Sequence, residues 1–185
     1  MNLKCNFIFE VSVIGASFLL LAAIPARAEV LLTEKAALAR AFPGVPTERR
    51  TLYLTEAQVT AVEKVAHSKL PSPVVTTFGA PAAGEDAGRA ILDTHVVRTM
   101  PETVMTVVAP GGRLRMALVL QFGEPPDYLP RDAWLKTLEG KPLDDELWPG
   151  RAVRRVTGST LTVQALTDAL RRCLAIDEVV FRGRP

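Results

Sequence analysis

The chain has 185 residues, which is long enough for one sizeable hydrophobic core. Its formal net charge is only +2, whereas a nucleic-acid-binding face requires a strong excess of basic residues. It contains two cysteines, and Cys5 lies in the N-terminal leader described below, so we expect no internal disulfide. Length, charge and cysteine content therefore predict a single globular domain that has no nucleic-acid partner.

The first 28 residues are typical of a secretory signal peptide. Lys4 supplies positive charge, residues 11–23 form an apolar core, and Ala26-Arg27-Ala28 fits an A-x-A cleavage site. Cleavage would remove Lys4, Arg27 and Glu10, so the formal charge would fall from +2 to +1. We expect an exported, periplasmic protein. The alternative is a membrane anchor with an uncleaved leader, although the apolar run is short for a transmembrane helix.

The remaining chain, 29–185, reads as one α+β domain. Helical spacing and capping residues predict helices at 33–41, 55–67, 132–138 and 163–174. Alternating or β-branched runs predict strands at 48–54, 74–78, 89–98, 104–108 and 114–122. Ala109-Pro110-Gly111-Gly112 is a hairpin turn between the last two strands. Three successive strands indicate an antiparallel sheet, which we expect to be flanked by the helices, with its core at about 89–175.

The last helix has one apolar and one polar face. The apolar face is formed by residues at helical spacing, namely Val163, Leu166, Leu170, Cys173 and Leu174. The polar residues Gln164, Asp168, Arg171 and Arg172 take the other side, and the two arginines are expected to close the last turn. Cys173 is expected to pack in the core as a small hydrophobic residue.

A loop rich in hydroxyl groups, residues 156–162, runs into this helix. The first four amide N–H groups of a helix have no partner within it, and the helix dipole favours negative charge at the same end. The loop is therefore a candidate phosphate site. The alternative is an ordinary helix start, because Ser and Thr are common N-caps. A capping box is excluded for Thr160, since Val163 stands where Glu or Gln is required.

The segment Thr157-Gly158-Ser159-Thr160-Leu161-Thr162 resembles the Ser/Thr-Gly-Ala-Thr-Leu-Thr signature of the FMN-binding domain family. That family includes flavin-carrying components of the sodium-pumping NADH:quinone oxidoreductase and of the Rnf complex. The resemblance extends over about residues 93–173. It implies FMN as cofactor, with the FMN phosphate esterified to the side-chain oxygen of Thr160. It also implies a periplasmic flavin transferase as a partner, since that enzyme makes the bond from FAD.

Two neighbouring features bear on the same resemblance. Arg154 and Arg155 occupy positions where the family has Asp, often followed by Gly, and Ser159 replaces the family's Ala. Two arginines beside a phosphate could strengthen its binding, so we expect Arg155 to be a cofactor-binding residue together with those of the loop. The segment Glu124-Pro125-Pro126-Asp127 resembles the family's Glu-Thr-Pro-Gly turn near the flavin. The resemblance implies that Glu124 is a cofactor-binding residue.

The resemblance implies an electron-transfer flavoprotein rather than a stand-alone enzyme. It would serve a membrane-associated or periplasmic redox chain and contact redox partner proteins. The alternative is a binding or structural module that keeps the fold without flavin, which Arg154 and Ser159 motivate. A flavin-dependent reductase would need a second, substrate-binding domain.

The sequence contains only weak signals for hydrolytic or metal-dependent chemistry. Asp93 and His95 alternate on one predicted strand and so point the same way, and with Ser159 they could be imagined as a hydrolytic triad. Nothing marks Ser159 as a nucleophile, so His95 is expected to be a polar residue on the sheet face. The acidic run 144–146 is expected to be a solvated turn rather than a metal site, since it has no histidine partner and no calcium-loop pattern. We therefore predict neither catalytic residues nor metal ligands.

Overall fold

The computed structural model describes residues 28–80, 87–154 and 156–183. Its strands are β1 (Glu29–Val30), β2 (Glu48–Tyr53), β3 (Val74–Gly79), β4 (Arg89–Val97), β5 (Met100–Val108) and β6 (Leu114–Phe122). Its α-helices are α1 (Glu34–Ala41), α2 (Glu56–Ala66), α3 (Asp132–Lys136) and α4 (Thr160–Ile176). A 3-10 turn, Pro126–Tyr128, precedes α3, and a π-helical turn, Asp177–Phe181, continues α4.

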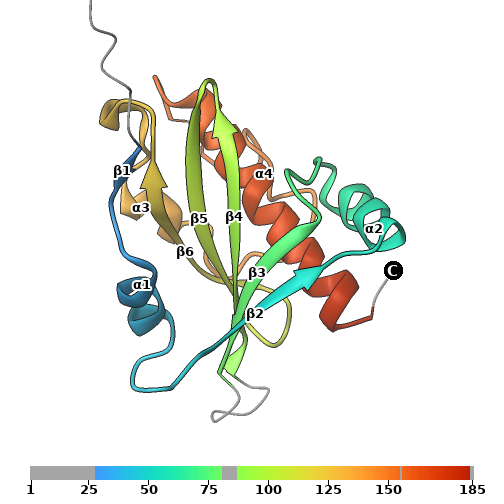
Figure 1. Ribbon diagram of the computed structural model, residues 1–185. Coiled ribbons are helices and arrows are strands. Elements are labelled where there is room, and N and C mark those ends of the chain that lie inside the picture. Colours follow the sequence, from blue (N-terminus) through green and yellow to red (C-terminus); the bar gives the residue numbers. More distant parts are fainter. Residues whose placement is uncertain (1–27, 81–86, 155, 184–185) are drawn as a thin grey trace, which may run out of the picture.

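The strands form one six-stranded antiparallel sheet in the order β1-β6-β5-β4-β3-β2. Strands β2 to β6 are neighbours in sequence order. β1, the first strand of the chain, pairs with the other edge of β6. β4 and β5 pair along their full length, from Arg89 opposite Val108 to Val97 opposite Met100. β3 pairs only with the first part of β4, up to Leu92 opposite Thr76. Strands β3 and β4 therefore diverge above that point, as Figure 1 shows.

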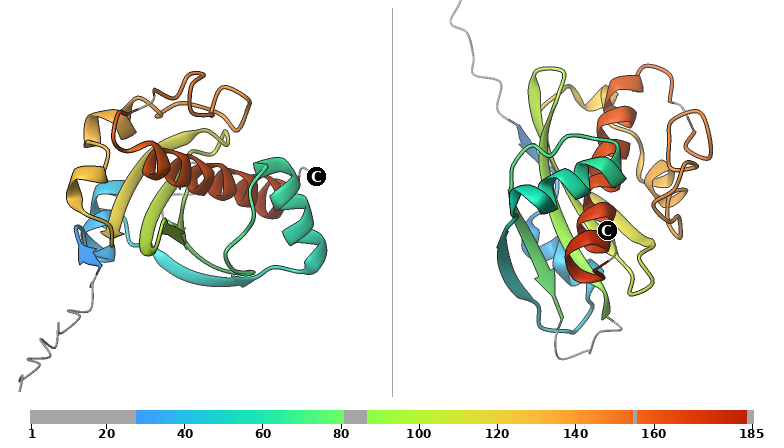
Figure 2. Two further views of the ribbon diagram at one scale, coloured as in Figure 1. Left: turned by 90° about the horizontal axis from the view of Figure 1, so that it is seen from above. Right: turned by 90° about the vertical axis from the view of Figure 1, so that its right-hand side faces the viewer.

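Both faces of the sheet carry hydrophobic residues, because side chains alternate along each strand. Ile91 points to the larger core, which lies between the sheet and α2, α3 and α4. Ala90, its neighbour in β4, points to the smaller core beneath α1. Helix α4 crosses behind the sheet, and α1 lies at its other side (Figures 1 and 2). The structure confirms the predicted α+β class and the antiparallel sheet with flanking helices.

Local sequence signals account for several boundaries. The Thr55 hydroxyl accepts from the N–H of Gln58, and the Gln58 side chain accepts from the N–H of Thr55, which is the predicted capping box. The predicted hairpin turn is closed by the N–H of Gly112, which donates to the carbonyl of Ala109 at 2.8 Å. Gly112 has a φ of +74°, a conformation that favours glycine.

Three predicted elements have clearly different lengths in the structure, and one of them is the last helix, which begins at Thr160 rather than at Val163. β5 begins at Met100 rather than at residue 104, because Pro101 pairs with Val96 in the long β4–β5 hairpin. α3 ends at Lys136, and its backbone then tightens into a turn in which Leu138 donates to Leu135. Trp134 and Leu138 are nevertheless both buried, as their predicted position on one face requires.

The prediction for the two arginines of the last helix was wrong, whereas Gln164 and Asp168 are half-buried. α4 starts at Thr160 and runs to Ile176, so Arg171 and Arg172 lie inside the helix rather than in its last turn. Their exposed fractions are only 2% and 5%. Burial is possible because their guanidinium groups are satisfied by polar partners within the fold. The apolar face of the helix, which includes Cys173, is buried as expected.

The predicted leader lies almost entirely outside the described residues, which begin at residue 28. Among the helices that are described, none combines the length and the apolar character needed to cross a bilayer.

Candidate functional site

The hydroxyl-rich loop leads directly into α4, with Thr160 as the first helical residue. Gly158 has a φ of +85°, and the N–H of Ser159 donates to the carbonyl of Val156 at 3.1 Å. The first intrahelical bond is donated by Val163 to the carbonyl of Ser159 at 2.9 Å. The amides of residues 160–162 precede that bond, so they are the helix-terminal donors that can face an anion.

The four hydroxyl side chains of the loop differ in access. Thr157 and Thr160 are exposed, whereas Ser159 and Thr162 are buried. Leu161, the second residue of the helix, is 53% exposed although it is apolar. The described first turn of α4 contains no acidic residue that would compete with an anion for the amides. The structure thus separates two accessible hydroxyls from two that pack inward.

The arginines before the loop are only partly described. The side chain of Arg154 is exposed, and its backbone carbonyl accepts a 2.7 Å hydrogen bond from Trp134 Nε1. That bond ties the approach to the loop to the buried face of α3. Arg155 lies outside the described residues, so its predicted role in phosphate binding stays a prediction.

Glu124 has a clear structural partner. Its Oε1 accepts from the N–H of Thr99 at 3.0 Å, from the Thr99 hydroxyl at 3.3 Å and from the N–H of Met100 at 3.1 Å. These bonds, led by the one from the Thr99 amide, hold the pKa of Glu124 below its usual value. The carboxylate therefore fixes the β4–β5 turn. This turn and the start of α4 lie at the same end of the molecule (Figures 1 and 2).

A buried polar network lies deeper, between the sheet and α4. His95 Nδ1 is 2.8 Å from Asp93 Oδ1, and His95 Nε2 is 3.0 Å from Glu102 Oε2. Asp93 and His95 are alternate residues of β4, and Glu102 lies opposite His95 on β5. Arg172 of α4 donates to both oxygens of Asp93, from Nε at 2.8 Å and from Nη2 at 2.7 Å. Its third nitrogen, Nη1, donates to the Ser68 hydroxyl at 2.9 Å.

Burial and hydrogen bonding act against each other on these groups. Burial raises the pKa of Asp93, but the bonds from Arg172 and His95 outweigh it and leave that pKa below its usual value. Burial lowers the pKa of His95, but the bonds to Asp93 and Glu102 outweigh it and raise that pKa. For Glu102, burial is the stronger influence and raises the pKa, although the bond to His95 opposes it. Asp93 is therefore the carboxyl group of the network that stays ionised.

The imagined hydrolytic triad does not form. Both ring nitrogens of His95 are engaged by carboxylates, so neither is directed to the hydroxyl of Ser159. The acidic run 144–146 is exposed, as predicted. Within the described ranges, no group of three acidic, histidine or cysteine side chains is arranged to hold a metal ion. His95 lies on the sheet face as expected, whereas Glu102 and Arg172 were not recognised as its network from the sequence.

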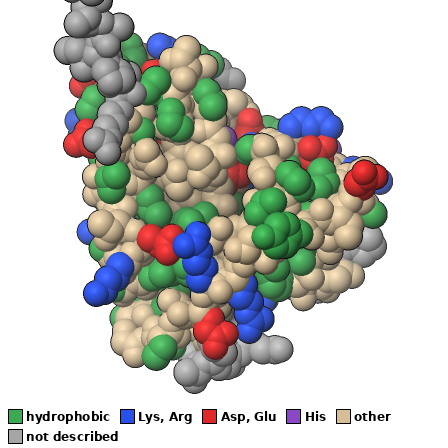
Figure 3. All heavy atoms as spheres, in the orientation of Figure 1, with side chains coloured by type: hydrophobic (Ala, Val, Ile, Leu, Met, Phe, Trp, Pro, Cys, Tyr) green, Lys and Arg blue, Asp and Glu red, His purple; other side chains and the backbone are tan. Residues whose placement is uncertain are grey.

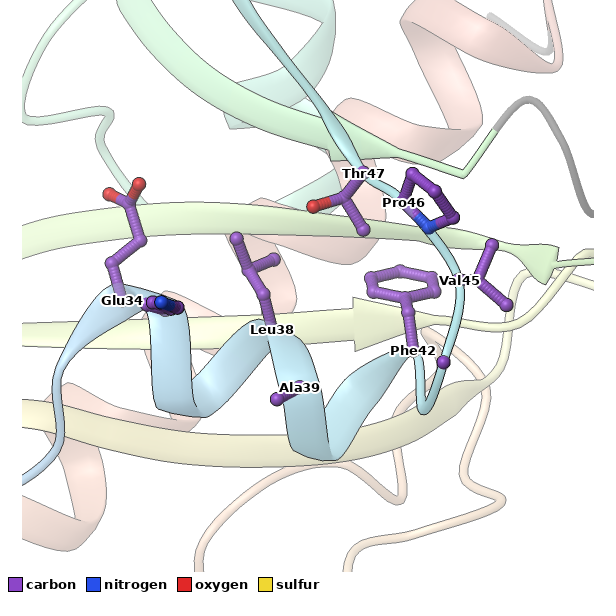
Figure 4. Close-up of a pocket in the computed structure, with 9 residues that line it drawn as sticks. Glu34, Leu38, Ala39, Phe42, Val45, Pro46 and Thr47 are labelled. Atoms are coloured by element: carbon purple, nitrogen blue, oxygen red, sulfur yellow. The ribbon is translucent and has the colours of Figure 1, made fainter.

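The surface has hollows that lie away from the hydroxyl-rich loop. The hollow drawn in Figure 4, of about 470 Å³, lies beside α1, and the side chains of Leu38, Phe42 and Val45 face it. A second, of about 450 Å³, lies between the chain after β1, strand β6 and α3. A third, of about 270 Å³, occupies the opening between β3 and β4 and is lined in part by Asp93. None of these three hollows includes a loop residue of 157–162.

Comparison with protein-family models, with curated proteins and with solved structures finds no match for this chain. The resemblance to the FMN-binding domain family therefore rests on the residues of the loop and of its neighbouring segments.

Proposed function

We propose that this protein binds FMN with the flavin phosphate at the start of α4 and acts as an electron carrier in a membrane-associated or periplasmic redox chain. The observation that carries the proposal is the accessible hydroxyl of Thr160, the first residue of a long helix and the position that matches the esterified residue of the resembling family. The proposal includes the assignment of the six-stranded sheet and α4 to the fold of the FMN-binding domain family.

The donor set of the loop fits a phosphate group. The amides of residues 160–162 lie at the positive end of the helix dipole, and the exposed hydroxyls of Thr157 and Thr160 can donate further hydrogen bonds. Each charge-assisted hydrogen bond to a phosphate is worth about 1.5–3 kcal/mol. The exposed side chain of Leu161 offers apolar surface beside these donors. Such a site holds a phosphate and leaves the rest of the ligand to contact the surface around it.

In this proposal each part of the chain has a simple role. FMN supplies the chemistry, since it accepts and passes on one or two electrons. Thr160 holds the phosphate through its oxygen, as an ester or through hydrogen bonds. Gly158 allows the backbone to turn into the helix, and Arg154 adds positive charge close to the loop. Redox partner proteins would meet the flavin at this end of the molecule.

The test compares two matched variants, Thr160→Val and Thr157→Val, because both threonines are exposed and lie three residues apart. Each protein is produced together with a flavin transferase and run on a denaturing gel. We expect a fluorescent band for the wild type and for Thr157→Val, and none for Thr160→Val, since valine has no oxygen to esterify.

The absorption spectrum of the native protein separates the remaining outcomes. Yellow protein that releases FMN on denaturation would show binding without the ester. Colourless protein that takes up no added FMN would contradict the proposal and leave a flavin-free module with this fold. A band that survives in Thr160→Val would move the attachment to another hydroxyl.

A further inference from the structure

His95 is held between two carboxylates in the interior of the protein. Its exposed fraction is 8%, and those of Asp93 and Glu102 are 6% and 0%. Each ring nitrogen lies within hydrogen-bonding distance of one carboxylate oxygen, at 2.8 Å and 3.0 Å. Each of these contacts requires a proton between nitrogen and oxygen, because two lone pairs at such a distance repel each other.

A count of protons follows from this geometry. A neutral imidazole carries one N–H and can satisfy only one of the two contacts. The second proton must reside either on the imidazole, which then is a cation between two anions, or on Glu102, which then donates to the ring. Both arrangements contain the same number of protons. The contacts observed are therefore those of a His95–Glu102 pair that has bound one extra proton.

Asp93 does not compete for this proton. Arg172 donates to both of its oxygens, which stabilises the carboxylate as an anion. Glu102 has no such partner, since its Oε1 is buried and finds no hydrogen-bond partner among the described residues. Its only polar contact among those residues is through Oε2 to His95. Loss of the extra proton would leave Glu102 as a buried anion facing a neutral ring, which is costly.

The network also connects three parts of the fold. Asp93 and Glu102 belong to the sheet, Arg172 belongs to α4, and Ser68 belongs to the connection between α2 and β3. Asp93 contacts His95 and Arg172 through the same oxygen, so this carboxylate links the imidazole to the arginine.

We propose that His95 and Glu102 form one buried proton-binding site that holds α4 on the sheet while the extra proton is bound and loosens α4 when the proton leaves. The charged and titratable groups around the pair are Asp93 on β4, and Asp168 and Arg172 on α4. This inference does not depend on flavin binding.

The direction of the pH dependence follows from these groups. Hydrogen bonding to the two carboxylates raises the pKa of His95 against the opposing effect of burial, and burial raises the pKa of Glu102. Both shifts favour the protonated pair. The folded protein therefore binds more protons than the unfolded chain above pH 6.5, the ordinary value for histidine. Stability from the pair is complete below that pH and is lost as the pH rises through the pKa of the pair.

The experiment uses the fact that the chain has two histidines. His67 is exposed with a φ of +52°, a conformation that asparagine tolerates, so His67→Asn leaves a single imidazole signal in NMR spectra. In that protein we expect His95 to titrate above pH 6.5, with loss of amide protection in α4 over the same pH range.

Glu102→Gln in the same background is the matched variant, because its amide can donate to a neutral ring without the extra proton. We expect the titration of His95 to move down by about one pH unit or more, and the pH dependence of α4 protection to disappear. The proposal is overturned if His95 in the His67→Asn protein titrates at or below pH 6.5, or if α4 protection does not follow its titration.

Discussion

At the scale of single residues, neighbours of the same type have different partners. Arg171 donates to three backbone carbonyls, those of Ala66, Asp144 and Leu147, and so joins α4 to the end of α2 and to the loop after α3. Arg172 pairs with a carboxylate instead. Burying a guanidinium group is costly unless its donors are satisfied, and both of these groups donate to oxygen partners within the fold. These partners explain why two arginines can lie inside α4.

Cys173 gives the first prediction at this scale. Its thiol is fully buried, and burial raises its pKa above the usual value, so the reactive thiolate is rare. We expect a thiol reagent to label Cys173 very slowly in the folded protein and rapidly in urea, as followed by mass spectrometry of the peptide that contains Cys173, which distinguishes it from Cys5. Rapid labelling without urea would mean that this face of α4 is not packed against Ile91 and its neighbours.

At the scale of elements, helix starts show how much local sequence can do. α2 begins with a full capping box, whereas α4 begins after Ser159 without a side-chain cap. The amides at the start of α2 are thus partly satisfied by its own side chains. Those at the start of α4 have no such cap, which is the condition that an anion site requires.

The capping box of α2 leads to a stability prediction. Thr55→Ala removes the hydroxyl that accepts from the Gln58 amide, and it should lower the free energy of unfolding by about 1 kcal/mol. Thr60→Ala is the matched control, because Thr60 is exposed in the interior of the same helix, where alanine is at least as favourable as threonine. Urea unfolding of both variants provides the measurement, and equal effects would deny the cap its role.

At the scale of the whole molecule, α4 is the element on which both proposals depend. It contacts β4, β5, β6 and α2, and its buried face supplies much of the larger core. Its first residue is Thr160, and three turns later Arg172 pairs with Asp93 on the sheet. The face drawn in Figure 3 shows acidic and basic side chains interspersed, whereas Arg172 and Asp93 pair in the interior.

The pairing of Asp93 and Arg172 predicts how the protein responds to acid. The pKa of Asp93 is lowered, so its contribution to stability is present above the ordinary value of 3.8 and is lost as the pH falls below it. Asp93→Asn should cost about 3–5 kcal/mol near neutral pH, because it leaves Arg172 as an unpaired buried charge. The difference between wild type and variant should shrink in acid, as measured by urea unfolding at several pH values.

Asp168→Asn is the control for this prediction. Burial raises the pKa of Asp168 despite the bond from Gln164, so its charged form costs stability above pH 3.8. Its replacement should therefore change stability with pH in the opposite direction to that of Asp93→Asn. A constant difference between wild type and Asp93→Asn at all pH values would show that the buried pair does not control acid unfolding.

The sequence by itself determined most of the elements and their boundaries. The capping box at Thr55, the turn before Gly112 and the alternation along β4 act over two to four residues, so their signals are visible in the chain. The same local information identified the loop before α4 as a helix start that is rich in hydroxyl groups.

Only the tertiary structure decided which polar side chains meet. Arg172 and Asp93 are 79 residues apart in the chain, and no local pattern can indicate that they pair. Glu102 gains its significance from the β4–β5 register, which places it opposite His95. The access of Thr160 and the burial of Thr162 likewise depend on how α4 packs. Burial and long-range pairing are properties of the folded chain, because they arise when distant elements exclude water between them.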